Sequence, residues 1–322
     1  MNIKATALAL GLGSLVAAAP VSAANIVTSI KPLELLVKAV AGDDANVTTL
    51  VPPGSSPHNY SMKPSQRRAL ENADAIFWVG PEMETFLNRL LSSEEFEGRV
   101  LAFTEGEAHD DSHEEAEREK QHDHGHDQHH DEPAHDEHGH DNHNHGDGDD
   151  PHIWVDPSLA LEMAHDIHQK LASLGELDQD QLDRNLAHFE QELATTEQTI
   201  REQLVPLHNI DVFAYHSAFE RFAEHYDLRL AGVLTLNPEL SPGARHIAEV
   251  QQKLENANQP CLLTEPQFDS QWWRSITEGL NVTFSTWDAL ATDIESSPQG
   301  YIDFQNSIAE AVMKCSPEQT EH

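Results

Sequence analysis

Short apolar runs alternate with amphipathic stretches along most of the chain. Before position 105, the apolar runs predict β-strands at 26–30, 47–51, 75–79 and 100–103, and helical periodicity predicts helices at 32–41, 64–73 and 82–92. The alternation returns with strands at 212–215, 229–236, 261–264 and 282–287, and with helices at 218–226, 242–256, 272–279 and 301–315. This pattern is typical of βα units, so we expect an α/β fold of two lobes, each with a parallel four-stranded sheet.

A longer helical pattern separates the two βα regions. Residues 158–174 have helical periodicity, and 178–204 form one amphipathic stretch without Pro or Gly. Its apolar positions, three and four residues apart, are Leu182, Leu186, Phe189, Leu193, Ile200 and Leu204. We therefore expect one long rigid helix to join the lobes. The predicted organisation is an N-terminal lobe at 24–177, a linker helix at 178–206 and a C-terminal lobe at 207–322.

The first 23 residues have the pattern of a signal peptide. Met1–Lys4 supply a positive start, Ala5–Ala19 is apolar, and Val21–Ala23 offers small residues of the kind that a signal peptidase requires. The apolar run is too short for a membrane span. We therefore expect an exported protein, cleaved near Ala23, rather than a buried N-terminal helix. No cysteine lies beside the cleavage site, which excludes lipid attachment there.

Residues 105–150 differ sharply from the rest of the chain. They are almost wholly His, Asp, Glu, Gly, Asn and Gln, and twelve histidines lie between Glu107 and Asp150. Such a composition cannot bury enough apolar surface to offset its ordering entropy, so we expect a disordered insert in the N-terminal lobe. Its histidines predict weak, exchanging metal sites, with a merely solvated acidic linker as the alternative. The candidate ligands are His122, His124, His126, His129, His130, His135, His138, His140, His143 and His145.

Charge and cysteine content narrow the possible functions. The formal net charge of −37 argues against nucleic acid and anionic membranes as partners, and it suits a cation ligand. Cys261 and Cys315 are the two cysteines. In an oxidising compartment an isolated pair most simply forms one disulfide, and two thiol metal ligands are the alternative.

Three histidines outside the insert lie at boundaries between strands and loops. They are His58, in a Pro- and Gly-rich loop, His152, just after the insert, and His216, at the end of an apolar strand. Ligands collect beyond the carboxyl ends of strands in open α/β sheets. Three imidazoles suit tetrahedral zinc and leave one position for a carboxylate or a water. Asp288, at the end of strand 282–287, is the candidate carboxylate.

Several motifs, in order along the chain, resemble the zinc-uptake solute-binding proteins of ABC transporters, the ZnuA type. The motifs are Pro57-His58-Asn59-Tyr60, Trp78-Val79-Gly80-Pro81-Glu82-Met83-Glu84, Pro151-His152-Ile153-Trp154, Tyr215-His216, Asn237-Pro238-Glu239, Pro242-Gly243-Ala244 and Thr264-Glu265-Pro266-Gln267-Phe268. The resemblance implies two lobes joined by a rigid helix, a Cys261–Cys315 disulfide and a metal site between the lobes. It also implies a monomeric periplasmic protein that delivers Zn²⁺ to an inner-membrane permease and its ATPase.

Carried over by position, the family's three metal-binding histidines are His58, His152 and His216. Manganese-binding members generally place Glu where His216 stands, so a third imidazole favours zinc. Two departures keep the fourth ligand open between Asp288 and water. Pro57 replaces a Glu found in some relatives, and Asp288 is followed by Ala-Leu-Ala instead of Pro-Leu-Gly.

Other functions and other residues complete the predictions. An exported zinc hydrolase is disfavoured because the chain has no His-Glu-x-x-His element, and we expect no enzyme activity. A manganese or iron importer and a metal buffer based on the insert are further alternatives. Glu265 either supports the metal site or has a purely structural role. The histidines within predicted helices, expected on solvated faces, are His165, His168, His188, His225 and His246.

Overall fold

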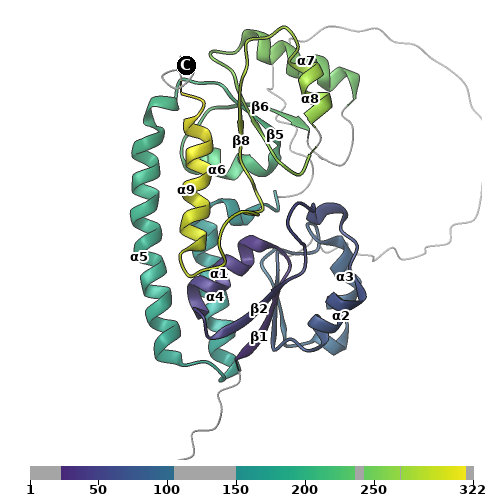
Figure 1. The fold of residues 1–322 in the computed structure, drawn as a ribbon, viewed down its shortest axis with the longest axis vertical. Helices are drawn as coiled ribbons and strands as arrows, with labels where there is room; N and C mark the ends of the chain where they lie inside the picture. The colour runs from purple at the N-terminus through teal and green to yellow at the C-terminus, as the bar shows by residue number, and fades with distance from the viewer. Residues whose placement is uncertain (1–22, 105–149, 236–242, 269, 317–322) are drawn as a thin grey trace, which may run out of the picture.

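Two four-stranded parallel sheets organise the chain, one in each half (Figure 1). The structure is a computed structural model that describes residues 23–104, 150–235, 243–268 and 270–316. The first sheet has the order β2-β1-β3-β4, and its strands are β1 (Ala24–Thr28), β2 (Ala45–Thr49), β3 (Ala75–Trp78) and β4 (Val100–Ala102). The second has the order β6-β5-β7-β8, with β5 (Val212–His216), β6 (Leu230–Thr235), β7 (Cys261–Thr264) and β8 (Thr283–Thr286). The predicted α/β fold with two parallel sheets is confirmed.

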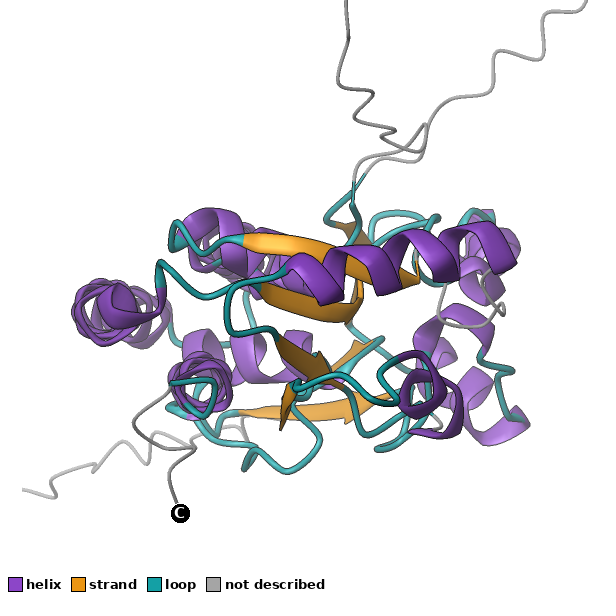
Figure 2. Cartoon of the chain, turned by 90° about the horizontal axis from the view of Figure 1, so that it is seen from above, coloured by secondary structure: helices purple, strands orange, loops and turns teal. Residues whose placement is uncertain are grey.

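Helices surround both sheets, as the view along the long axis shows (Figure 2). Those of the first half are α1 (Lys31–Ala41), α2 (Pro64–Glu71), α3 (Thr85–Leu91) and α4 (Pro157–Leu174). The long helix α5 (Gln179–Leu204) follows, and then come α6 (Glu220–His225), α7 (Ala244–Asn256), α8 (Ser270–Ile276) and α9 (Gly300–Met313). One outer apolar cluster lies under α2 and α3, and another lies under α7 and α8. The opposite faces of both sheets share one large cluster, which runs through both halves.

Helix α5 runs along the side of the molecule and packs against α1, α4 and α9 (Figure 1). Asp178 caps its first turn by accepting a hydrogen bond from the backbone N–H of Gln181. All six predicted apolar positions of this helix are buried, so the predicted stripe is confirmed. Asn185 donates to the carbonyl of Val40 in α1 at 2.9 Å, and Phe189 contacts Tyr301 of α9. The helix is therefore fastened to elements of both halves.

Helix α9 belongs to the C-terminal half but lies directly against α1. Gly300, its first residue, leaves so little room that an added Cβ would lie 2.7 Å from Leu35 of α1. Ser296, in the loop before α9, donates a hydrogen bond to Glu34 of α1. The two halves therefore meet through close packing as well as through the long helix.

The two cysteines form the Cys261–Cys315 disulfide, with a Cα–Cα distance of 5.6 Å. It joins the start of β7 to the chain just after α9, and the alternative of two thiol ligands is therefore wrong. Among the described residues, no helix is both long and apolar enough to span a membrane. Residues 1–22 of the predicted signal peptide lie outside the described residues. So do residues 105–149 of the predicted insert, which include its ten candidate histidines.

Candidate metal centre

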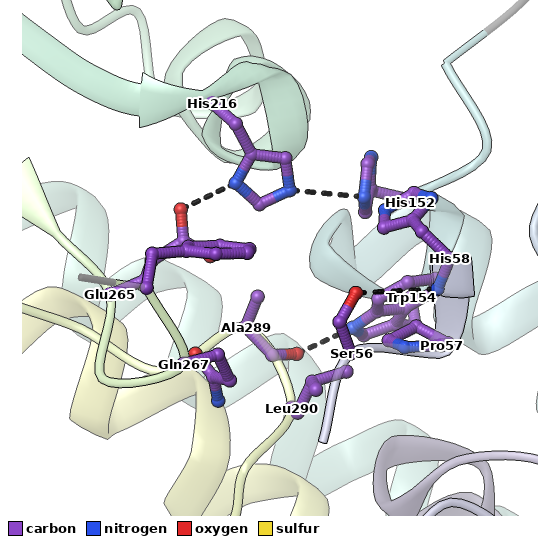
Figure 3. A pocket seen from close by; sticks show the side chains of 11 residues that line it. Ser56, Pro57, His58, His152, Trp154, His216, Glu265, Gln267, Ala289 and Leu290 are labelled. Atoms are coloured by element: carbon purple, nitrogen blue, oxygen red, sulfur yellow. Dashed lines mark hydrogen bonds and ion pairs between the residues drawn. The ribbon is translucent and has the colours of Figure 1, made fainter. Parts of the chain in front are cut away.

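His58, His152 and His216 come from three separate segments and meet in one cavity (Figure 3). Each contributes a ring nitrogen, and these nitrogens all lie within 4.8 Å of one another. The Nε2 atoms of His152 and His216 are 3.3 Å apart. Two nitrogens bound at 2.0–2.1 Å to one tetrahedral zinc lie about 3.3 Å apart. The spacing of this pair therefore already matches shared coordination of one ion.

The cavity between the histidines is small. Its volume is about 20 Å³, which is roughly the space that a single water molecule needs. The described residues that line it, besides the three histidines, are Ser56, Pro57, Trp154, Glu265, Gln267, Phe268, Ala289 and Leu290. A cavity of this size suits a single ion.

His58 lies in the loop that leads from β2 to α2. It is the central residue of a 3-10 turn, Pro57–Asn59. The Oγ of Ser56 caps this turn by accepting from the backbone N–H of His58 at 3.3 Å. Pro57 fixes its own backbone angle, so the turn starts in a defined direction. Local proline and serine chemistry thus orients this histidine.

His152 lies just before a second 3-10 turn, Ile153–Val155, and its side chain is buried. Its Nδ1 bonds the Oδ1 of Asp150 at 2.5 Å. Arg221 of α6 in turn donates through Nε to the carbonyl of Asp150 at 2.9 Å. With Nδ1 donating to a carboxylate, the lone pair on Nε2 faces the other histidines and is available to a metal.

His216 is the last residue of β5. Its Nδ1 bonds the Oε1 of Glu265 at 2.5 Å, and Glu265 follows β7, the next strand in the sheet. Both side chains are almost completely buried. These residues lie where the strand order of the second sheet reverses, which is the usual binding position in open α/β sheets. The hydrogen bond to His216 supports the interpretation of Glu265 as a residue that supports the site.

Burial keeps two of the candidate ligands in the neutral form that metals bind. Desolvation, together with the neighbouring His152 and His216, lowers the pKa of His58 to about 3. Desolvation also lowers the pKa of His152, although Asp150 acts in the opposite direction. Metal binding at these two imidazoles therefore does not first require the loss of a proton near neutral pH.

Asp288 is the predicted ligand that does not join the cluster. Its Oδ1 accepts hydrogen bonds from the Nε2 of Gln267 at 2.6 Å and from the backbone N–H of Leu290 at 2.9 Å. Its Oδ2 accepts from the N–H of Thr292 at 2.7 Å. The described residues that line the cavity include Gln267 and Leu290 but not Asp288. Binding of this carboxylate to the metal stays a prediction.

Asp150 is a site residue that the sequence reasoning missed. The composition around it places it in the predicted acidic insert, yet its carboxylate bonds His152 and its carbonyl accepts from Arg221. The available signal was an acidic residue two positions before a candidate ligand, but the many acidic residues of the insert concealed it.

His225 is not on a solvated face as predicted. Its side chain is only 12% exposed, and it lies 3.3 Å from Asp156 and 3.1 Å from Glu197. The prediction failed because it counted only helical position, whereas the two acidic partners come from other segments of the chain.

Comparison with known proteins identifies the family of this chain. Residues 26–315 match the family model described as "Zinc-uptake complex component A periplasmic", ZnuA. The chain belongs to the ZnuA family. The resemblance predicted from the motifs is therefore confirmed, and the family is one of periplasmic solute-binding transport proteins.

Two ZnuA relatives span nearly the same length. A "High-affinity zinc uptake system protein ZnuA" from Yersinia pestis is 33% identical over 304 residues, which cover 91% of this chain and 92% of the relative. The protein of the same name from Brucella abortus is 35% identical over 310 residues, with coverages of 91% and 92%.

Solved ZnuA structures share the fold. A "Crystal structure of ZnuA" superposes with a TM-score of 0.67 at 24% identity and covers 92% of this chain and 100% of its own. A "138-173 ZnuA deletion mutant plus zinc bound" gives a TM-score of 0.69 at 22% identity, with coverages of 92% and 98%.

Proposed function

We propose that this protein captures Zn²⁺ in the periplasm and delivers it to an inner-membrane ABC permease driven by its ATPase. The observation that carries the proposal is the convergence of three imidazoles on one cavity, with two Nε2 atoms 3.3 Å apart. The names of the Yersinia and Brucella relatives, high-affinity zinc uptake proteins, point in the same direction.

The proposed ligands are one ring nitrogen each from His58, His152 and His216. Imidazole nitrogens suit zinc, whereas carboxylate oxygens suit manganese, so this donor set supports zinc as the cargo. Asp150 and Glu265, the carboxyl partners of His152 and His216, orient the rings and place negative charge around a divalent cation.

We assign the fourth position to a water rather than to Asp288. The carboxylate of Asp288 would have to give up hydrogen bonds from Gln267, Leu290 and Thr292 to reach a metal. Gln267 lines the cavity, and its Oε1 is buried without a hydrogen-bond partner in the described part of the chain. That oxygen is a suitable acceptor for a metal-bound water.

The proposal includes export and a monomeric state. Cleavage near Ala23 would release the mature chain into the periplasm, and N-terminal sequencing of the exported protein tests this. A chain that still begins at Met1 would contradict export by this route. Analytical ultracentrifugation of the zinc-loaded protein tests the monomer.

Zinc titration of three proteins tests the central proposal. These are the intact chain, a variant with His58, His152 and His216 all replaced by Ala, and a deletion of residues 107–148 that keeps Asp150. We expect one tight site in the intact and deleted proteins and its loss in the triple variant. We expect only the weak sites to disappear with the insert. Tight binding by the triple variant, or its loss on deletion, would refute the assignment.

A further inference from the structure

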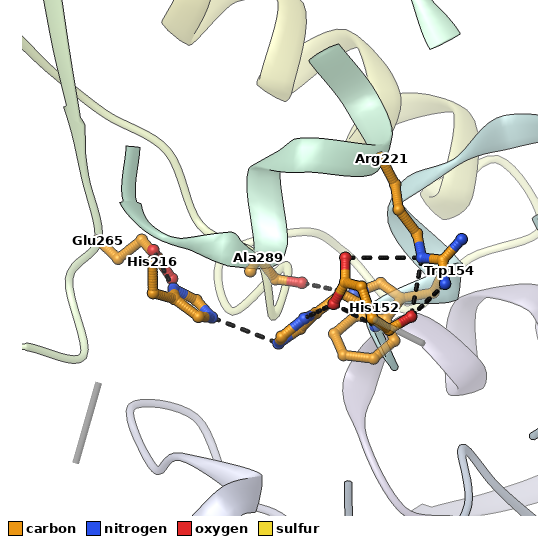
Figure 4. A network of polar contacts seen from close by, with 7 residues as sticks. His152, Trp154, His216, Arg221, Glu265 and Ala289 are labelled. Atoms are coloured by element: carbon orange, nitrogen blue, oxygen red, sulfur yellow. Dashed lines mark hydrogen bonds and ion pairs between the residues drawn. The ribbon is translucent and has the colours of Figure 1, made fainter. Parts of the chain in front are cut away.

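His152 precedes the long helix α5 in the chain, so its position in the sequence assigns it to the N-terminal lobe together with His58. The hydrogen bonds around it, however, reach the C-terminal half. The 3-10 turn that follows it, Ile153–Val155, is hydrogen-bonded to the C-terminal half at several points. The indole N–H of Trp154 donates to the carbonyl of Ala289 at 2.8 Å (Figure 4). The hydroxyl of Tyr301 donates to the carbonyl of Trp154 at 2.8 Å.

A further bond extends this attachment. Gln305 of α9 donates through Nε2 to the carbonyl of Val155 at 3.2 Å, and it also donates to the hydroxyl of Tyr301 at 2.8 Å. Trp154, Tyr301 and Gln305 are all fully buried. The turn after His152 is therefore held by the loop before α9 and by α9 itself.

Arg221 attaches the other side of His152 to the C-terminal half. It lies on α6, five positions after His216, and α6 begins shortly after β5 ends. Its guanidinium donates to the carbonyl of Asp150 through both Nε, at 2.9 Å, and an Nη. The Nε also lies 3.6 Å from the Oδ2 of Asp150. Oδ1 of the same carboxylate bonds His152 at 2.5 Å. Arg221 is therefore linked to the candidate ligand His152 through Asp150 (Figure 4).

The loop of His58 is fastened to the N-terminal half instead. The backbone N–H groups of Leu50 and Val51 donate to the carbonyls of Thr28 and Ser29, each at 2.9 Å. At the other end of the loop, Gln66 of α2 donates to the carbonyl of Leu50. The segment of His152 is therefore hydrogen-bonded to the C-terminal half, although it continues into α4, which packs against α1 of the first half. The loop of His58 is bonded to the first half.

We propose that Arg221 is a positioning residue for the zinc site, which fixes His152 against His216 through Asp150. His152 is thereby fastened to the C-terminal half, although it precedes α5 in the chain and its segment continues into α4. Arg221 touches neither the cavity nor the metal position, and it acts by holding the backbone and the carboxylate that orient one imidazole. This inference rests on the proposed zinc binding by the three histidines.

Zinc affinity of Arg221 variants, measured by competition with a chelator on the full-length mature protein, tests the proposal. Loss of a residue that orients a metal ligand lowers affinity by about 10- to 100-fold, and we expect this for Arg221→Gln. Arg221→Lys should fall between that variant and the wild type, because an ammonium supplies no two-pronged donor. Arg245→Gln, which removes a comparable arginine–carboxylate pair on the exposed face of α7, should leave affinity unchanged.

Double-mutant cycles separate positioning from a general loss of stability. Adding Arg221→Gln to Asp150→Ala should lower affinity by less than the sum of the two single losses, because Asp150→Ala already removes the carboxylate that orients His152 and leaves only the backbone carbonyl for Arg221 to hold. Adding it to Ser56→Ala, which loosens the turn of His58, should give additive losses. The visible absorption of Co²⁺-loaded Arg221→Gln should also change, while that of Arg245→Gln should not.

The outcomes distinguish this inference from the proposed function. Wild-type affinity in Arg221→Gln, or losses that add in the Asp150→Ala background, would overturn the positioning role while zinc binding by the histidines stood. Tight zinc binding by the triple histidine variant would instead refute the proposed function itself.

Discussion

At the scale of single residues, two of the three histidines have the same kind of hydrogen-bond partner. His152 and His216 each bond a carboxyl group through Nδ1, at 2.5 Å in both cases, and so present Nε2 to the cavity. Such a partner can act by orienting the ring or by adding negative charge near the cation. The two effects can be separated at Glu265, because glutamine keeps an acceptor oxygen but removes the charge.

Glu265→Gln should therefore lower zinc affinity about 10-fold without abolishing the site. The amide oxygen can still accept from Nδ1 of His216, so the ring should stay oriented while the charge is lost. Chelator competition measures the change, and Glu249→Gln on the exposed face of α7 is the control. Wild-type affinity in Glu265→Gln would show that orientation alone matters.

Glu84 is a second buried carboxyl group, but it lies in the first sheet's half. It accepts hydrogen bonds from Ser29 and from the backbone N–H groups of Val79 and Gly80. Burial nevertheless raises its pKa to about 7 from 4.5. The folded state therefore holds a proton that the unfolded state releases above pH 4.5, and this group's contribution to stability is lost as pH rises through 7.

Between pH 5 and pH 8, the zinc-free wild type should lose about 3 kcal/mol of unfolding free energy relative to Glu84→Gln. The variant does not titrate at this position, so the difference between the two proteins isolates the group. Urea denaturation at both pH values measures it. Glu82→Gln, exposed two residues away, should follow the wild type. An equal difference at both pH values would contradict the shifted pKa.

At the scale of elements, the contact between α1 and α9 shows how closely the halves are packed. An added Cβ on Gly300 would lie 2.7 Å both from Leu35 of α1 and from the carbonyl oxygen of Glu295. Such distances require the backbone or the packed side chain to move. Glycine at the start of α9 is therefore required by Leu35 and by the carbonyl of Glu295, and not by the angles of its own backbone.

Gly300→Ala should lower the free energy of unfolding by about 1–3 kcal/mol, the usual cost of overpacking. Gly243→Ala is the control, since nothing lies within 4 Å of its added Cβ. Gly243 is the N-cap of α7, where alanine is less favourable than glycine, so its loss should stay within about 1 kcal/mol. Chemical denaturation of both variants decides the matter. Equal stabilities would mean that α9 shifts without cost.

At the scale of the whole molecule, the two halves repeat one strand order but use it differently. The order β2-β1-β3-β4 matches β6-β5-β7-β8. In both parallel sheets, the order in which the chain adds strands reverses between the two central strands. In the second half that position carries His216 and Glu265. In the first half Ser29, after β1, donates a buried hydrogen bond to Glu84, after β3. The first half contributes His58 from the loop after its edge strand, β2, instead.

The disulfide lies away from this position, at the opposite end of β7. Replacing Cys261 and Cys315 by Ala should lower the free energy of unfolding by roughly 3–4 kcal/mol, because a cross-link constrains the unfolded chain. Zinc affinity should stay within a factor of about two to three. Parallel denaturation and zinc titration measure both effects, and a large loss of affinity would mean that the disulfide also shapes the site.

The local patterns of the sequence determined the elements and most of the candidate ligands. Strands, helices and the buried stripe of α5 follow from apolar periodicity, which depends on neighbours only a few residues away. The position of His216 at the end of β5 follows from the same pattern, and so does the expected βα fold. His58 does not lie at a strand end as predicted, because a 3-10 turn in the loop after β2 carries it. Sequence motifs alone also identified the family.

Only the tertiary structure decided the partners of these residues. Asp150 and Arg221 are 71 positions apart, and Trp154 and Ala289 are 135 apart, so no local pattern could relate them. Asp288 lies at the predicted strand end, yet the loop after β8 directs its carboxylate to the N–H groups of Leu290 and Thr292. Such choices depend on how segments from both halves pack, and the periodicity of one segment carries no information about another.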